Sequence, residues 1–301
     1  MNKFQALGVL CLLCVPCGDA WAQRAAEPPR FDAGRAYEHM RQLVAIGPRP
    51  AGSPAIASAR QYIAAQITQL GLRVVEQPFD ADSPIGPVRM VNLLVTIPGV
   101  RRERLIVGGH YDTKLFRNVR FVGANDGGSS AAFLIELARV LKDRSNPFTV
   151  ELVFFDGEEA FNLTWVDPDN TYGSRHYVAD ARRTGTLAGI KAMVLVDMIG
   201  DRQLTIRREE ASTQWLTDTI WASAQKLKQP GFVNEGLRVE DDHMHFLDAG
   251  VPAVDIIDLD YPAWHTPADT LEQVSARSLQ SVGDVLLDAL PTIEARLLKN
   301  R

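Results

Sequence analysis

Apolar side chains recur every three or four positions in several segments of the chain, which is the period of an amphipathic helix. Two early segments, residues 36–47 and 53–71, have this pattern. The second begins at Ser53, a residue type that caps helix N-termini, and stops at Gly71. The same period predicts further helices over 127–144, 172–183, 211–228 and 276–298. In the last of these, Pro291 predicts a kink or a division, because proline removes a hydrogen bond and clashes with the preceding turn.

Short runs rich in leucine and β-branched residues lie between the helical segments. They are bounded by glycine, proline and charged residues, and they predict strands over 88–99, 102–112, 148–158, 190–200 and 250–259. Each run is apolar on both faces, as expected of strands that are covered by helices on both sides. The alternation of strands and helices predicts one α/β domain, a three-layer α/β/α sandwich around a twisted, mostly parallel (mixed) β-sheet.

The first 22 residues have a different pattern. Lys3 precedes a short apolar run, and an Ala-x-Ala sequence closes at Ala22, so we interpret residues 1–22 as a cleaved signal peptide that is too short to span a bilayer. A buried N-terminal helix is the alternative, and the proline-containing residues 23–34, interpreted as an N-terminal extension, disfavour it. Residues 35–301 would then form the single domain of a secreted or periplasmic protein without a membrane span.

All three cysteines, Cys11, Cys14 and Cys17, lie in the predicted signal peptide. The mature chain would therefore have no disulfide and no thiolate ligand, so any metal would be held by His, Asp and Glu. A lipid anchor on Cys17 is disfavoured, because Pro16 and Cys14 are poor choices for the small residues that such a site needs.

Composition and charge exclude some classes of function. The chain has 46% hydrophobic and 23% charged residues, a globular composition, and its formal net charge is −5. Lysine and arginine are scattered rather than gathered, so we expect no nucleic-acid partner.

Acidic and imidazole side chains follow several of the predicted strands. Open sheets bind ligands outside the carboxyl ends of their strands, so these side chains should meet at one edge. The residues are His110, Asp112, Asp156, Glu158, Glu159, Asp197 and, further along the chain, His265; Asp126 begins a predicted helix beside glycines.

A cluster of carboxylates at one edge would repel itself and resist burial. A divalent cation would resolve this conflict. Oxygen and imidazole ligands without thiolate fit a catalytic Zn²⁺ site with an open position. Manganese and cobalt would also accept such a set, and zinc is favoured.

The chain resembles the M28 metallopeptidase superfamily over roughly residues 35–295. The motifs that carry the resemblance are GGHYDT, GANDGGSSAAFLIELARVL, FFDGEEAF, YGSRH, LVDMIG, EDDHMHFL and WHTPADT. This superfamily contains zinc aminopeptidases and glutaminyl-peptide cyclotransferases of the animal type, and the resemblance implies a zinc-exopeptidase-like fold. It also implies that Glu158 is the catalytic carboxylate and that the metal-ligand positions are His110, Asp126, Glu159, Asp197 and His265.

Several features are similar to the cyclotransferases in particular. The spacer between Glu159 and the Gly-Ser turn is long, and Lys114 follows the HYDT motif. By the resemblance, Trp264 would donate its indole N–H to the substrate, and Asp197 and Asp241 would hydrogen-bond the nitrogen groups between which the proton moves. Further substrate-binding positions would be Lys114, Trp165 and Phe161, the last two as walls of a small apolar pocket for a glutamine side chain.

The chain also departs from the cyclotransferase pattern. Its spacer is one residue longer, Asp255 stands in place of a histidine, and His245 in place of a proline. These changes put the hydrogen bonding around the ligands in doubt. The metal count also stays open: cyclotransferases resemble one-zinc enzymes that use Asp126, Glu159 and His265, whereas aminopeptidases use all five positions for two metals.

Three functions therefore remain open. The first is a zinc-dependent glutaminyl-peptide cyclotransferase that converts N-terminal Gln of peptides or proteins to pyroglutamate and releases ammonia. The second is a two-zinc aminopeptidase, and the third is a non-catalytic binding ectodomain of the same fold. The complete set of ligand positions together with Glu158 disfavours the third. The favoured enzyme would carry one zinc, with two as the alternative, and would act as a monomer.

Overall fold

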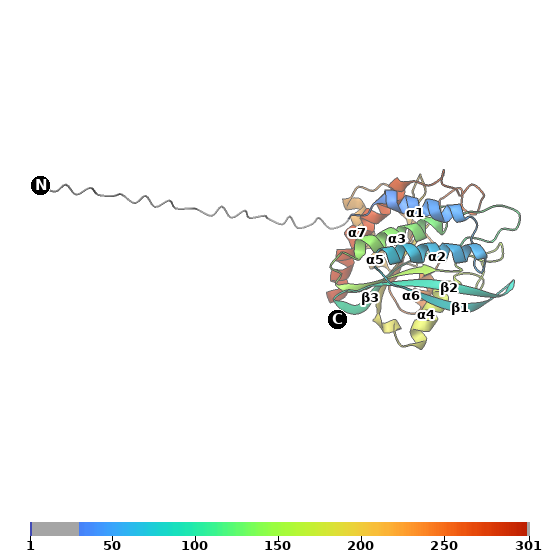
Figure 1. Cartoon of the computed structure of the whole chain (residues 1–301), viewed down its shortest axis with the longest axis horizontal. Helices are drawn as coiled ribbons and strands as arrows, with labels where there is room; N and C mark the ends of the chain where they lie inside the picture. The colour runs from blue at the N-terminus through green and yellow to red at the C-terminus, as the bar shows by residue number, and fades with distance from the viewer. Residues whose placement is uncertain (2–29, 300–301) are drawn as a thin grey trace.

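The structure is a computed structural model that describes Met1 and residues 30–299. A six-stranded sheet with the order β1-β2-β4-β3-β5-β8 forms its centre (Figure 1). Its strands are β1 (Val74–Ser83), β2 (Gly86–Ile97), β3 (Arg101–His110), β4 (Phe148–Phe155), β5 (Ile190–Asp197) and β8 (Ala253–Ile257). The predicted signal peptide lies outside the described residues.

Most of the sheet is parallel. Strands β4, β3, β5 and β8 run in the same direction, and β2 pairs with β4 and β1 with β2 in antiparallel register. Pro78 lies in β1 at the edge of the sheet, where its missing N–H costs no ladder bond. The predicted mixed, mostly parallel sheet is thereby confirmed, and the carboxyl ends of four strands share one edge.

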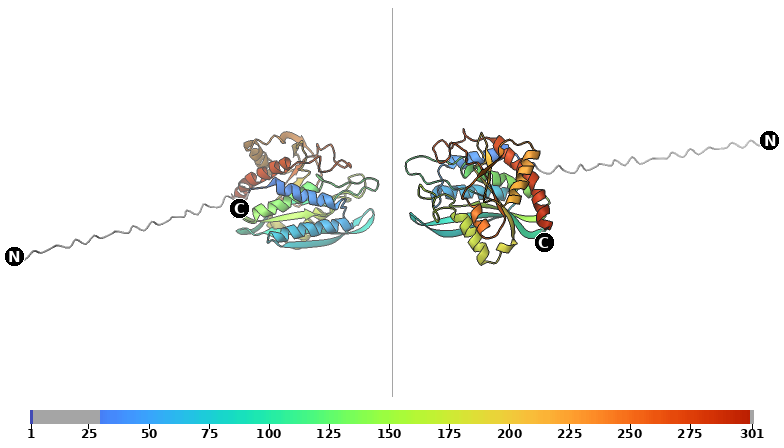
Figure 2. Two further views of the ribbon diagram at one scale, coloured as in Figure 1. Left: turned by 45° about the horizontal axis from the view of Figure 1, so that its top comes forward. Right: turned by 180° about the vertical axis from the view of Figure 1, so that it is seen from behind.

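Helices cover both faces of the sheet, as two views from other directions also show (Figure 2). Separate apolar cores fill the two interfaces. On one face lie α1 (Ala33–Ile46), α2 (Pro54–Gln69), α3 (Gly128–Leu141), α5 (Gln214–Lys226) and α7 (Ala276–Lys299); on the other lie α4 (Tyr172–Arg183) and α6 (His243–Asp248). The three predicted layers are therefore present.

The predicted helices and strands are all found, with small shifts at their ends. Ser53 caps α2 as expected, since its Oγ accepts a hydrogen bond from the Ile56 N–H at 3.2 Å. Pro291 does not divide the last helix, which runs through it as one element. Elements without a predicted counterpart are β1, α6 and a small parallel pair, β6 (Ile206–Glu209) and β7 (Phe232–Leu237).

The folded domain begins before residue 35. Phe31 is 3% exposed and its ring packs against Phe133 with centroids 4.9 Å apart, while Asp32 caps α1. The predicted extension therefore contributes its last residues to the core. Among the helices of residues 30–299, none has the length and apolar character that a membrane span needs.

Candidate metal centre and active site

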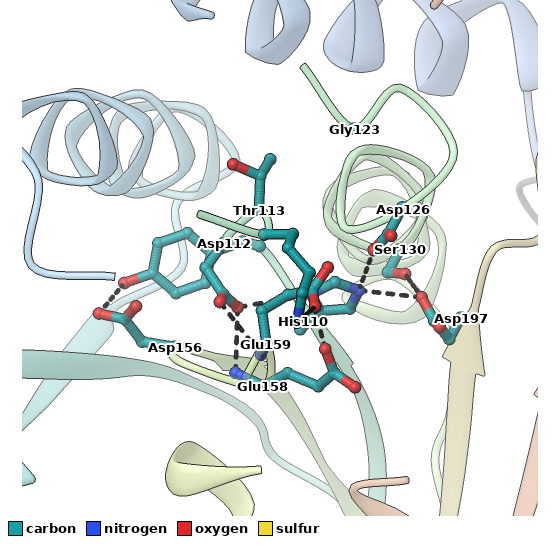
Figure 3. Close-up of polar contacts among 12 residues, drawn as sticks. His110, Asp112, Thr113, Gly123, Asp126, Ser130, Asp156, Glu158, Glu159 and Asp197 are labelled. Atoms are coloured by element: carbon teal, nitrogen blue, oxygen red, sulfur yellow. Dashed lines mark hydrogen bonds and ion pairs between the residues drawn. The ribbon is translucent and has the colours of Figure 1, made fainter. Parts of the chain in front are cut away.

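The strand ends bring the predicted ligand positions together. His110 ends β3, Asp197 ends β5, and Glu158 and Glu159 follow β4, so that these side chains gather at the carboxyl edge of the sheet (Figure 3). Asp126 reaches the same point from the loop before α3. His265 comes from the segment after β8.

Two sets of three side chains could each hold a metal ion. One consists of Asp126, Glu159 and His265, the other of His110, Asp126 and Asp197, and within each set the ligand atoms lie within 4.8 Å of one another. Asp126 belongs to both. Five positions that lie far apart in the chain thus form one centre with a shared carboxylate.

The first set carries carboxylate oxygens without partners. Asp126 Oδ2 and Glu159 Oε2 are buried and have no hydrogen-bond partner among the described residues. Buried carboxylate oxygens in that state are costly, and a cation would satisfy both. Each set also has one contact between an imidazole and a carboxylate, His265 Nε2 to Glu159 Oε1 at 3.1 Å in the first and His110 Nε2 to Asp197 Oδ1 at 3.0 Å in the second. The residues present therefore fit a metal, and they fit it best at Asp126, Glu159 and His265.

The loop that presents Asp126 is held tightly. The carboxylate of Asp269 accepts hydrogen bonds from the N–H groups of Asn125 at 2.8 Å and Asp126 at 3.1 Å. Gly127 follows with a φ of +74°, and a Cβ there would lie 2.3 Å from the Asp112 carbonyl oxygen. Only glycine fits this position, because both the backbone conformation and the close approach exclude a side chain.

The two glutamates are held by one aspartate. Asp112 accepts from the Glu158 N–H through Oδ1 at 3.2 Å and from the Glu159 N–H through Oδ2 at 3.3 Å. The same Oδ1 lies 3.4 Å from His110 Nδ1, so Asp112 also orients the imidazole. Glu159 then joins the first ligand set, whereas Glu158 stays outside both sets, with Oε2 3.7 Å from His110 Nδ1.

Burial controls the protonation of these acids. Desolvation, and the proximity of Glu159, raise the pKa of Asp126 to about 6. Desolvation likewise raises the pKa of Glu159 to about 7, and it raises the pKa of Glu158 well above its usual range. A cation in the centre would oppose these shifts, because its charge favours the ionised carboxylates.

His265 has an unusual backbone conformation, with φ of +53°. A non-glycine residue in this region is uncommon and is often found at functional sites. Its Nε2 lies 3.1 Å from Glu159 Oε1 and 3.4 Å from Asp126 Oδ2. The conformation therefore aims the imidazole at the two carboxylates.

A cavity of about 470 Å³ opens over the centre. Apolar walls line it beside the acids, among them Trp165, Leu259 and Trp264, and Trp264 stacks on His265 with ring centroids 4.4 Å apart. Glu158, Asp197 and Asp241 also face this cavity. Such a mixture of apolar walls and converging polar groups is typical of a small-ligand site.

Two predicted substrate-binding residues have other surroundings. Phe161 is not among the residues that line the cavity; it packs against Tyr172, because its main chain turns back to the Asp169 carboxylate. Lys114 does line the cavity, but its side chain is only 2% exposed, and its Nζ donates to the Ala160 carbonyl at 2.8 Å and lies 3.6 Å from Glu159 Oε2.

Two aspartates shape the site from outside the cavity lining. Asp112 was expected at this edge of the sheet and Asp269 was not; they hold the backbones that carry Glu158, Glu159 and Asp126. Asp112 lies in the GGHYDT motif and Asp269 in the WHTPADT motif, so the sequence contained a signal for both positions. Nothing in an Asp residue type, however, distinguishes a ligand from a group that accepts backbone hydrogen bonds.

The comparisons with known proteins agree with this geometry. Residues 92–290 match the model of peptidase family M28. The glutaminyl-peptide cyclotransferase of Boiga irregularis is 32% identical over 275 residues, which cover 78% of this chain and 74% of that protein.

Solved structures of a glutaminyl cyclase and of an exopeptidase are also similar to this chain. An Acidobacteriales bacterium glutaminyl cyclase superposes with a TM-score of 0.86 at 38% identity and covers 91% of this chain and 99% of its own. A Zn-dependent exopeptidase from Parabacteroides distasonis has a TM-score of 0.80 at 22% identity, over 91% and 100% of the chains, and shows the shared fold alone.

The chain has the zinc-exopeptidase-like fold, and its candidate metal-ligand positions gather at the carboxyl edge of a mixed sheet. The chain belongs to peptidase family M28. Within that family its similarity is to the glutaminyl-peptide cyclotransferases, in sequence and in structure.

Proposed function

We propose that this chain is a zinc-dependent glutaminyl-peptide cyclotransferase that acts on peptides or proteins with N-terminal Gln. In this reaction the α-amine nitrogen attacks the γ-carboxamide carbon, the bond from that carbon to the amide nitrogen breaks, and the amine proton leaves with ammonia. The family resemblance and the names of the relatives support the reaction. The proposal of a metal rests on the buried oxygens of Asp126 and Glu159 that have no hydrogen-bond partner among the described residues.

Asp126, Glu159 and His265 would hold one zinc ion, which supplies a Lewis acid for the γ-carbonyl oxygen when bound. Trp264 lines the cavity next to His265, where its indole N–H would donate to the same oxygen. The apolar surfaces of Trp165 and Leu259 would exclude water and hold the methylene groups of the glutamine side chain.

Glu158 is our choice for the residue that moves the proton. Its side chain faces the cavity and belongs to neither ligand set. A carboxylate in this place would accept a proton from the α-amine and return it to the leaving nitrogen. Asp197 and Asp241, which line the same cavity, would hydrogen-bond the two nitrogens and hold them beside Glu158.

A two-zinc aminopeptidase is the second candidate, and one observation favours it. The set His110, Asp126 and Asp197 lies beside the first set and shares Asp126 with it, so a second ion has ligands available. Two stably bound zinc ions per chain and release of a free N-terminal residue would identify that enzyme.

Mass spectrometry of a Gln-initiated peptide, incubated with the purified protein, separates the two candidates. A mass decrease equal to one ammonia supports the cyclotransferase, and loss of one residue supports the aminopeptidase. Metal analysis of Glu159→Ala and His265→Ala tests the ligands: both variants should lose zinc and turnover together. Full zinc content with full turnover in either variant contradicts the assignment.

We further propose that the chain functions as a secreted or periplasmic monomer. The predicted signal peptide supports the location. Size-exclusion chromatography with light scattering, applied to protein recovered from a periplasmic or culture fraction, tests both points.

A further inference from the structure

Glu209 is a buried carboxylate outside the ligand sets with an unusual number of donors around it. It is 3% exposed and ends β6. Its Oε2 accepts from the Ser212 N–H at 2.6 Å and the Ser212 hydroxyl at 2.8 Å, and its Oε1 accepts from the Ala211 N–H at 2.9 Å. Burial raises the pKa of Glu209, but the hydrogen bond with His243, together with those from Ala211 and Ser212, outweighs burial and lowers the pKa to about 2, so the group is a fixed negative charge.

The same carboxylate holds both ends of a segment of the cavity wall. At one end Oε1 accepts from the Val239 N–H at 3.4 Å. At the other end Oε2 lies 3.1 Å from His243 Nε2, and the side chains of both residues are fully buried. Residues 239–243 are thus fastened at their first and last positions to one side chain of β6.

Asp241 lies in the middle of that segment and faces the cavity. Its carboxylate accepts from the Asp242 N–H at 2.5 Å, and the Asp242 carboxylate accepts from the Ser174 hydroxyl of α4 at 2.5 Å. Asp241 Oδ2 is buried and has no hydrogen-bond partner among the described residues. The position of this oxygen depends on where the 239–243 segment is held.

We propose that Glu209 and His243 are positioning residues that fix Asp241 for proton transfer in the reaction. The proposal rests on the proposed function, since it concerns Asp241 as a partner of the nitrogens that exchange the proton. Neither residue lines the cavity. They act through the backbone of residues 239–243, so they should affect the rate of the chemical step and leave substrate binding and zinc content alone.

The charge of Glu209 is essential to this arrangement. A glutamine has nearly the same shape, but its NH₂ group would face N–H and hydroxyl donors and could not accept from them. A buried donor left without an acceptor is costly, so the segment would shift until water or another group satisfied it. Small displacements in a catalytic geometry are expensive, because misplacement by about 1 Å costs up to about 10²-fold in rate.

The experiment measures kcat, KM, zinc content and melting temperature for Glu209→Gln and a matched control, Glu136→Gln. Glu136 is also a buried carboxylate, 1% exposed, which accepts from the Asp32 N–H at 2.8 Å and pairs with Arg139. It lies in α3 ten residues beyond Asp126, about 15 Å along the helix. Both variants should lower the melting temperature, and only Glu209→Gln should lower kcat, by about ten- to a hundredfold, with KM and zinc unchanged.

Two variants of His243 keep the proposal testable if Glu209→Gln does not fold. In His243→Gln the side-chain amide can donate to Glu209 from a similar place, so this variant should keep most of the wild-type kcat. In His243→Leu the donor is absent and kcat should fall as in Glu209→Gln.

The outcomes separate this inference from the proposed function. Equal kcat values for Glu209→Gln, Glu136→Gln and wild type would overturn the inference alone, as would equal kcat values for the two His243 variants. A wild-type protein that forms no pyroglutamate would overturn the proposed function, and the inference with it.

Discussion

Glu158 and Glu159 are neighbours in the chain, but their side chains have different surroundings. Successive residues after a strand point in different directions, so one carboxylate reaches Asp126 and His265 while the other faces His110 and the cavity. Asp112 holds both backbone N–H groups and so fixes this divergence. In the proposed function the pair would divide two tasks, ligation and proton transfer, between adjacent positions.

Replacing Glu158 by glutamine should remove proton transfer and leave the fold intact. Glutamine keeps the shape of the side chain but has no carboxylate that could take up the proton. Proton transfer by a positioned side chain is worth about 10²–10⁴-fold in rate. We expect turnover on a Gln-peptide to fall at least about a hundredfold with normal zinc content. Loss of zinc in the same variant would mean that the roles of the two glutamates are reversed.

The substitution Trp264→Phe removes the indole N–H but keeps an aromatic ring, so it tests the role of the N–H alone. The side chain is 42% exposed at the cavity and its ring stacks on His265, which phenylalanine can still do. Removing a donor to the oxygen that develops charge costs about 10²–10³-fold in turnover. Steady-state kinetics with Gln-peptides measure this loss, and an unchanged rate would reduce Trp264 to a packing role.

At this scale the sequence predicted which acidic and imidazole side chains meet at one edge of the sheet. The places of His110 and Asp197 were predictable because they end apolar strands, and parallel strands bring their carboxyl ends together. Asp269 and Glu209 were not, since their donors include the backbone N–H groups of Asp126 and Val239, which lie far along the chain. Phe161 stays a predicted substrate-binding residue; it lies outside the cavity lining, and its N–H donates to Asp169.

Among the elements, the turn before α3 is the most constrained. Gly127 combines a positive φ with a close contact to the Asp112 carbonyl, and it directly follows Asp126. The turn therefore couples a ligand position to the residue that holds the two glutamates.

Gly127→Ala should weaken zinc binding as well as stability. The added Cβ meets the Asp112 carbonyl at 2.3 Å, so both loops must move. Gly185→Ala is the matched control, because its φ of +71° is similar but no heavy atom lies within 4 Å of the new Cβ. Both variants should lose about 1 kcal/mol of stability from backbone strain, and titration with a zinc chelator should show weaker binding only for Gly127→Ala. Equal zinc affinity in the two variants would contradict this coupling.

The predicted elements were those with a strong apolar period. β1 was missed because its exposed face and Pro78 interrupt the pattern, and β6, β7 and α6 because each is short. Pro291 was expected to kink or divide the last helix, and it does not divide it, because tertiary packing holds the helix together: Leu290 and Ile293 on either side of Pro291 are buried in the core.

For the whole molecule, the stabilisation of the folded state by a bound metal should depend on pH. In the metal-free protein the pKa values of Asp126 and Glu159 are about 6 and 7, above the values of these groups in an unfolded chain. Raised carboxyl pKa values cost no stability below about pH 4 and an increasing amount as pH rises through 6 and 7, because the unfolded chain then loses its protons more readily. Bound zinc removes this cost.

Chelation should therefore lower the melting temperature more at about pH 8 than at about pH 5.5, since zinc also competes less with protons at the higher pH. Calorimetry with and without a chelator measures the difference at each pH. His265→Ala serves as the control and should show little response to the chelator at either pH. An equal effect at both pH values in the wild-type protein would count against the linkage.

The order of the ligands along the chain has a consequence for how the enzyme comes into being. Asp126 and Glu159 precede β5 and β8, whereas His265 follows the last strand of the sheet. If zinc binds at the proposed set of Asp126, Glu159 and His265, a growing polypeptide would carry only the two carboxylates of that set through most of its synthesis and would gain His265 after every strand has been translated. Loading of the ion at that set would then be a late event, and a fragment interrupted before β8 would lack this metal site.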